Sequence, residues 1–240
     1  MTEHQKKFFK LCISGNAGEI REAIRNGAEI NKIDERGFMP LGLAVMFNKD
    51  AEVVEELLKA GARLRLEERN YTELLLFTMK HPPTPEVIQL LMDYGKLTDV
   101  RGHDGTSTLM ISAAENAVDV ARALLKSGAN VNAARCDGTT ALMCAARKNS
   151  AEMVKILIDA GAWVFAKDSN KMTALHHAAM NTQNPEIIKI LIEAGAQDSQ
   201  ILNGKTALDF ARENSKLSGS PEIKMLEELN ELNEFNGKKA

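Results

Sequence analysis

The chain has 240 residues, of which 44% are hydrophobic and 26% charged, and its formal net charge is −3. This is the composition of an ordinary soluble globular protein, and the length allows a core without disulfides or bound metal. A surface that binds nucleic acid through bulk positive charge needs clustered Lys and Arg, which a balance of 30 basic against 33 acidic residues does not favour. We therefore expect no nucleic-acid partner.

The cysteines and the N-terminus bear on the cellular compartment. Cys12, Cys136 and Cys144 match no zinc or redox spacing, so we expect three reduced thiols. The first residues contain no apolar stretch of the kind a secretory signal has, and no run approaches the roughly 18 apolar residues of a membrane helix. These features predict a cytoplasmic protein without a membrane partner.

A Gly-Ala pair recurs along the chain at a nearly constant spacing, with Gly-Lys replacing it once. Each glycine follows an amphipathic stretch, such as residues 53–59 or 154–159, with apolar side chains at helical spacing. About twelve residues later a second, alanine-rich helix is predicted, as at residues 140–146 and 173–179. The repeating unit is therefore a turn, a helix of small residues, a larger apolar helix and a glycine. The six glycines are 33 or 34 residues apart: Gly27, Gly61, Gly95, Gly128, Gly161 and Gly195.

Several helix starts carry capping signals. Thr2-Glu3-His4-Gln5 has the pattern of a capping box. Later helices are predicted to begin where a capping side chain precedes a proline in the first helical position, at Thr84-Pro85, Asn184-Pro185 and Ser220-Pro221.

Two segments carry a family resemblance. Residues 137–146, Asp-Gly-Thr-Thr-Ala-Leu-Met-Cys-Ala-Ala, and residues 128–133, Gly-Ala-Asn-Val-Asn-Ala, resemble the ankyrin repeat, and the resemblance runs from about Thr2 to Leu232. It implies an all-α solenoid of stacked helix-turn-helix units joined by hairpin-like turns. About seven units are expected in a single domain over 1–240: an N-terminal cap at 2–34, repeats at 35–67, 68–101, 102–134, 135–167 and 168–201, a C-terminal cap at 202–234 and a tail at 235–240.

Catalytic signals are weak. Gly204-Lys205-Thr206 is similar to the end of a phosphate-binding loop, but Ser199 stands where that loop needs its first glycine. His176 and His177 point about 100° apart on a helix and cannot share one metal ion. We expect His176 to hydrogen-bond Thr173 or the turn backbone, and we expect no enzyme activity, no metal and no cofactor.

The resemblance implies instead a protein or peptide partner, bound by the concave face of the first helices and by the turn tips. Phe38, Met46 and Phe47 are the preferred apolar hot spot. Phe47 has two open interpretations, an exposed anchor or a side chain folded back into the core. The full set of candidate partner-binding residues is Phe38, Met46, Phe47, Lys80, His81, His103, Asp104, Arg147, Lys148, Met172, Met180 and Trp163.

Two further expectations concern charge and aromatic residues. Arg147 and Lys148 beside Met180 would form a basic edge that selects an acidic partner segment. Trp163 is expected to be exposed and Phe165 to pack between units. The predicted function is non-catalytic protein binding by a monomer. The alternatives are a self-associating structural subunit and an effector or adaptor in a host-interaction setting.

Overall fold

The computed structural model describes residues 1–48, 50–63, 84–94, 101–102, 104–148, 150–198 and 203–237. The regular elements of this part of the chain are all helices; Ala134 and Thr140 form an isolated antiparallel bridge, and Arg101 and Ser107 are also single bridge residues. The described residues contain thirteen helices: α1 (Glu3–Ser14), α2 (Ala17–Arg25), α3 (Pro40–Phe47), α4 (Ala51–Lys59), α6 (Pro85–Asp93), α7 (Thr108–Glu115), α8 (Val118–Lys126), α9 (Ala141–Arg147), α10 (Ala151–Asp159), α11 (Ala174–Asn181), α12 (Glu186–Glu193), α13 (Ala207–Glu213) and α14 (Pro221–Gly237).

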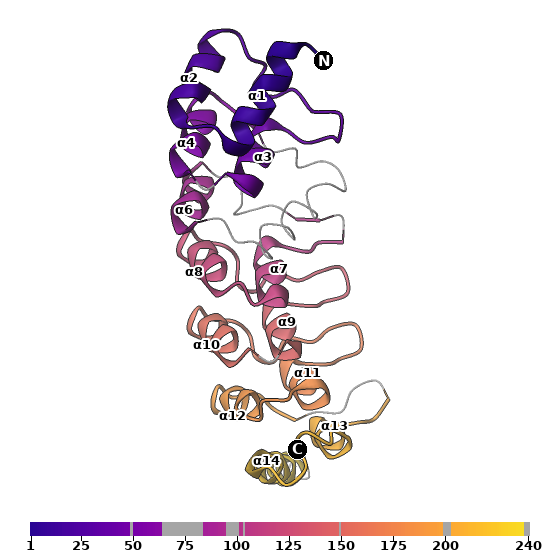
Figure 1. The fold of residues 1–240 in the computed structure, drawn as a ribbon. Helices are drawn as coiled ribbons and strands as arrows, with labels where there is room; N and C mark the ends of the chain where they lie inside the picture. The colour runs from indigo at the N-terminus through magenta and orange to yellow at the C-terminus, as the bar shows by residue number, and fades with distance from the viewer. Residues whose placement is uncertain are drawn as a thin grey trace. The chain divides into compact units, whose positions relative to one another are not determined.

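The helices belong to two compact units. The first comprises Met1–Gly102 with Lys126–Gly128, and the second comprises His103–Leu125 with Ala129–Ala240. In the first unit, α1 packs against α3. In the other row, α2 packs against α4, and α4 packs against α6. In the second unit, α7, α9, α11 and α13 form one row, and α10, α12 and α14 form a second row beside it, on the left in Figure 1. Stacked helix-turn-helix pairs are thus confirmed, whereas the boundaries of individual repeats stay predictions.

Residue size explains the two rows. Ala141, Ala145 and Ala174 on the first helices are at most 1% exposed, and their small side chains let neighbouring helices approach closely. Val154 and Leu157 on α10 are fully buried, so the larger apolar residues of the second helices fill the space between layers. No helix pair could bury these faces alone, and stability therefore comes from contacts between neighbours.

The turns before the first helices are tight and repeat the same geometry. The Oδ1 atom of Asp168 accepts hydrogen bonds from the backbone of Asn170 and Met172, at 2.8 and 2.9 Å. The backbone N–H of Asp168 donates to the Met172 carbonyl at 3.0 Å, which closes the turn. Adjacent turns are also linked, because the Ser169 N–H donates to the Asp137 carbonyl at 2.8 Å. In Figure 1 these turns project beyond α9 and α11 on the side away from the second row.

Two of the predicted capping arrangements differ in the structure. Thr2 accepts from the Gln5 N–H at 3.3 Å, but the Gln5 side chain does not return to Thr2. It instead bonds both the N–H and the carbonyl of Glu29, at 3.0 Å each, and so ties α1 to the loop after α2. The Ser220 hydroxyl is buried and has no hydrogen-bond partner, so it does not cap α14.

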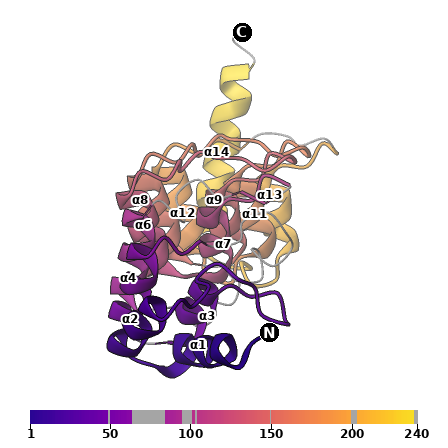
Figure 2. The ribbon, with the colours of Figure 1, turned by 90° about the horizontal axis from the view of Figure 1, so that it is seen from above.

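The Thr84 signal is confirmed, because Thr84 Oγ1 accepts from the Val87 N–H at 3.4 Å and α6 begins at Pro85. The Asn184 signal is confirmed only in part: Asn184 Oδ1 accepts from the Glu186 N–H at 3.1 Å, but α12 begins at Glu186, so Pro185 takes the N-cap position instead of the first helical position. The last helix is longer than expected, because α14 continues to Gly237 instead of ending before a tail at 235. Figure 2 shows α14 reaching past its neighbours α12 and α13.

Candidate protein-binding surface

The C-terminal ends of α9 and α11 present cations and an apolar side chain to solvent in the second unit. Arg147 and Lys148 at the end of α9 are exposed, and Met180 near the end of α11 is 44% exposed. Among the described residues no ion pair involves Arg147 or Lys148, whereas Arg122, Lys155 and Arg212 each pair with a glutamate. We call these three residues the first-helix surface.

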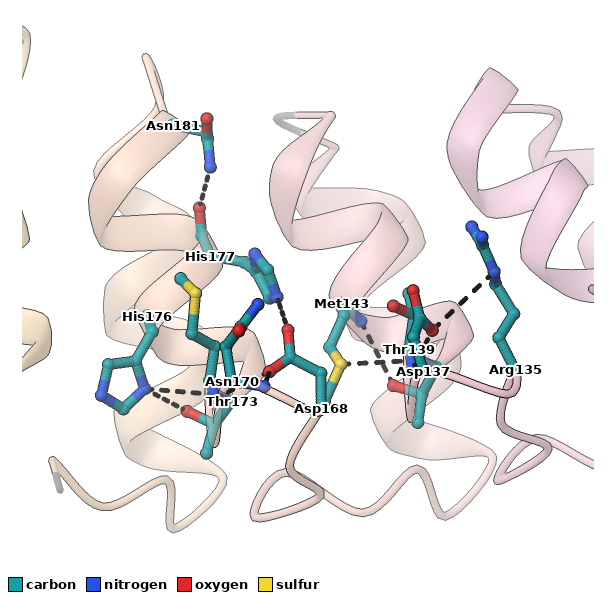
Figure 3. Close-up of polar contacts among 12 residues, drawn as sticks. Arg135, Asp137, Thr139, Met143, Asp168, Asn170, Thr173, His176, His177 and Asn181 are labelled. Carbon is teal, nitrogen blue, oxygen red and sulfur yellow. Dashed lines mark hydrogen bonds and ion pairs between the residues drawn. The ribbon is translucent and has the colours of Figure 1, made fainter. Parts of the chain in front are cut away.

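His177, on the same helix as Met180, is held by a contact with Asp168 in the turn before that helix. Its Nε2 atom is 3.0 Å from Asp168 Oδ2, its backbone carbonyl accepts from Asn181 at 3.0 Å, and its Nδ1 atom is buried without a hydrogen-bond partner (Figure 3). Burial lowers the pKa of His177, while the Asp168 carboxylate opposes that shift and the Arg147 guanidinium adds to it. The ring is therefore neutral at pH 7, and the charge of Arg147 reaches α11.

His176 has the structural role expected of it. The ring is fully buried, and its Nδ1 atom is 2.9 Å from Thr173 Oγ1 and accepts from the Thr173 N–H at 3.2 Å. Its other side approaches Asp198, a buried carboxylate whose oxygens accept from the first N–H groups of α13, at Ala207 and Leu208. Burial raises the pKa of Asp198, and these two backbone donors oppose the rise.

Asp104 is exposed at a turn, as expected, but its carboxylate is already engaged. It accepts from the Thr106 N–H at 2.9 Å and pairs with Arg135 at 3.1 Å. These contacts hold the pKa of Asp104 below its usual value, the bonds from Thr106 having the largest effect. Arg135 also lies 3.8 Å from Asp137 (Figure 3). The turn is therefore stiffened by charges that compete with any ion pair to a partner.

In the first unit the three apolar candidates lie at opposite ends of one helix. Phe38 precedes α3 and is half-buried under the guanidinium of Arg36, 5.7 Å from the ring centre. Met46 and Phe47 end α3, about 12 Å further along its axis. Phe47 is 45% exposed, so the interpretation that it folds back into the core is wrong. The three residues thus offer two separate apolar positions.

Two expectations about exposure are corrected in the second unit. Met172 is 7% exposed because its backbone closes the Asp168 turn and its side chain is drawn inward, so it cannot contact a partner. Phe165 is 66% exposed instead of packed between units. It occupies the third position of a turn from Trp163 to Ala166, a position whose side chain points outward, whereas Val164 points into the core. Trp163 is exposed, as expected, at 58%.

Three candidate residues, Lys80, His81 and His103, lie outside the described residues. Within the described part of the chain, no three His, Cys, Asp or Glu side chains are grouped so as to hold a metal ion. Lys205, from the segment similar to a phosphate loop, is bound to the Glu213 carboxylate at 2.6 and 2.8 Å.

A family model for ankyrin repeats in three copies matches residues 75–168 and 163–229 of the sequence. The chain belongs to the ankyrin-repeat family. Ankyrin repeats generally mediate protein–protein interactions and are generally non-catalytic. The matched residues include both the first-helix surface and Trp163, so these exposed side chains lie within the matched ankyrin repeats.

Two curated relatives share part of this sequence. The chain is 31% identical over 126 residues to the nuclear factor NF-kappa-B p105 subunit of Gallus gallus, an alignment covering 47% of this chain and 13% of that protein. It is 33% identical over 126 residues to the ankyrin repeat domain-containing protein SAT10 of Stachybotrys chartarum, covering 52% of this chain and 6% of that protein. The chain therefore corresponds to a small part of either relative.

None of the described helices is both long enough and apolar enough to span a lipid bilayer.

Proposed function

We propose that this ankyrin-repeat chain is a non-catalytic binding module that holds a protein partner against the ends of its first helices and the neighbouring turns. The observation that carries the proposal is the first-helix surface: Arg147 and Lys148 are exposed and have no acidic partner among the described residues, and Met180 is exposed near the end of α11, the helix that packs against α9. Exposed cations that form no ion pair with the described residues are available for ion pairs with a partner.

The chemistry of this surface indicates the partner segment that fits it. Two cations next to an exposed thioether suit a segment with acidic residues and an apolar side chain, since Met adapts its shape to varied apolar groups. The helix that carries Met180 is anchored to its own turn, because the side chains of His177 and Asp168 are buried and hydrogen-bonded to each other.

In the first unit the same role falls to Phe47, the most exposed of the three apolar candidates there. Aromatic side chains carry a disproportionate share of binding energy at interfaces. Phe47→Asp is the substitution that tests this second contact without altering the second unit.

Quantitative affinity capture from native lysate, with bound proteins identified by mass spectrometry, tests the proposal. The test variant carries Arg147→Glu and Lys148→Glu, and the control carries the same charge change at Lys126→Glu and Lys189→Glu on the second helices α8 and α12. We expect the test variant to retain a captured protein at least about tenfold less well than the control, a difference of about 1.4 kcal/mol. Equal retention by both variants would contradict the proposal.

The salt dependence of capture gives an independent check. Ion pairs at the rim of an interface are screened by salt, so retention by the unaltered protein should fall as ionic strength rises. The charge-reversed variant should show little salt dependence. A salt-independent partner would exclude the cations as its contacts.

A further inference from the structure

Trp163 and Phe165 form an exposed, ordered pair of aromatic rings. Their ring centres lie 6.5 Å apart and their planes differ by 10°, which is a stacked arrangement. The turn that holds them is closed by a hydrogen bond from the Ala166 N–H to the Trp163 carbonyl at 3.3 Å, and Val164 between them is buried. The backbone therefore fixes two large apolar side chains on the surface instead of in the core. We call these two residues the aromatic pair.

Phe165 occupies a position that serves stability in the preceding repeat. There Asn132, also four residues after the glycine that ends the second helix, donates to the Gly161 carbonyl at 3.0 Å and accepts from the Trp163 N–H at 2.8 Å. One repeat further on, the corresponding backbone groups belong to Gly195 and Gln197. A phenyl ring cannot form these hydrogen bonds, and Phe165 is 66% exposed, so neither hydrogen bonding nor packing between repeats explains this residue.

Two other aromatic rings, Phe38 and Phe210, are covered by the chain's own cations. Arg36 lies over Phe38 at 5.7 Å, and Lys205 lies over Phe210 at 5.3 Å. No cation of the described residues lies over Trp163 or Phe165 in this way, and Trp is the best cation acceptor among the aromatic side chains. The aromatic pair is therefore open to a cation from outside the chain.

A negative charge lies close to the pair in the sequence. Asp159, in the last turn of α10 and four residues before Trp163, is exposed and takes part in no ion pair with a described residue. An exposed aromatic ring with a carboxylate four residues away in the sequence suits a cationic group, and a planar guanidinium stacks on a ring more readily than an ammonium does.

We propose that the aromatic pair binds an arginine side chain of a protein partner, with the guanidinium stacked on the rings and its charge balanced by Asp159. This site is separate from the first-helix surface. The short connection between α9 and α10 makes these packed helices antiparallel, so the end of α10 that leads to Trp163 lies opposite the end of α9 that carries Arg147. The inference does not rest on the proposed function.

Trp163 is the only tryptophan of the chain, so its fluorescence reports this site alone. The probe is the synthetic peptide acetyl-Ser-Gly-Arg-Arg-Gly-Ser-amide, and its control is the same peptide with both arginines replaced by citrulline, which keeps the shape and removes the charge. We expect a saturable change in emission with the arginine peptide. The citrulline peptide should bind at least about tenfold more weakly.

The variant Phe165→Asn separates binding from folding. It removes one ring, retains the fluorophore and supplies the side chain that bridges repeats at Asn132. We expect this variant to resist urea at least as well as the unaltered protein while its affinity for the arginine peptide falls at least about fivefold. Arg147→Glu with Lys148→Glu should bind the peptide unchanged, which distinguishes this site from the first-helix surface.

Three results would overturn the inference. Equal affinity for the citrulline peptide would mean that the rings recognise no charge. Undiminished affinity in Phe165→Asn would mean that the pair is not the site. A Trp163 emission that changes with protein concentration before any peptide is added would mean that a second copy of the chain covers the rings.

Discussion

The side-chain oxygen of Asn132 accepts a hydrogen bond from the backbone N–H of Trp163 at 2.8 Å, although 31 residues separate them in the sequence. The amide of the same side chain donates to the Gly161 carbonyl at 3.0 Å. Asn31 makes the equivalent pair of bonds to Gly61 and Arg63 in the first unit. One asparagine thus satisfies two backbone groups of the next repeat, which regular helices leave without partners.

Asn132→Ala should therefore lower the free energy of unfolding by about 1–2 kcal/mol, because two backbone groups lose their partner but remain near solvent. Urea denaturation followed by circular dichroism measures this. The reverse change, Phe165→Asn, should raise stability by up to about 1 kcal/mol. An unaltered midpoint for Asn132→Ala would show that water replaces the bridge without cost.

Gly138 and Gly161 allow a matched comparison of steric and conformational cost. Both have positive φ, at 80° and 86°, but a Cβ atom on Gly138 would lie 2.9 Å from Asp168 Cα and 3.0 Å from the Lys167 carbonyl oxygen. A Cβ on Gly161 meets nothing within 4 Å. Gly161→Ala should cost about 1 kcal/mol and Gly138→Ala about 2–4 kcal/mol. Similar losses for both would show that the adjacent turns separate easily.

The neutral state of His177 has a measurable consequence for stability. Because burial lowers its pKa below 6.5 in the folded protein, the unfolded chain binds the proton more readily between the two values. The contribution of neutral His177 to the free energy of unfolding is therefore complete above about pH 6.5. It is lost as the pH falls towards the pKa that His177 has in the folded protein. Nuclear magnetic resonance of the ring should show a pKa below 6.5. Asp168→Asn should lower it further, and a rise on that substitution would contradict the assigned contact.

The three cysteines should react with iodoacetamide in a fixed order. Cys136 is exposed and should be labelled first. Burial raises the pKa of Cys144, and it raises the pKa of Cys12 to about 12 in a site with no exposed surface. Cys12 should therefore be labelled only when the first unit unfolds. Mass spectrometry of timed samples measures the order, and early labelling of Cys12 would contradict the packing of α1.

The fold could be predicted because its signals are local and repeated. A glycine every 33 or 34 residues, small residues on one helix and branched apolar residues on the next indicate both the helices and their stacking. The capping errors arose where long-range contacts decide the outcome. Gln5 matches a capping box, yet its side chain bonds the backbone N–H and carbonyl of Glu29, 24 residues away, a contact that the local pattern does not reveal.

The surface was harder to predict than the helices. Asn132 sits at the position of Phe165, and comparing the two would have indicated an outward-facing ring, but aromatic residues are normally taken as core. The His177–Asp168 contact joins a helix to its own turn, nine residues apart, and only the turn geometry brings them together. Met172 is buried for the same reason, since its backbone closes that turn.

Site-specific photocrosslinking tests the central claim most directly. A benzoylphenylalanine placed at Lys148, at the end of α9, is compared with one at Lys189, on the outer side of α12, in the same native lysate. We predict that one protein is crosslinked from position 148 and not from position 189. Crosslinking of a partner from position 189 alone would contradict binding at the first-helix surface.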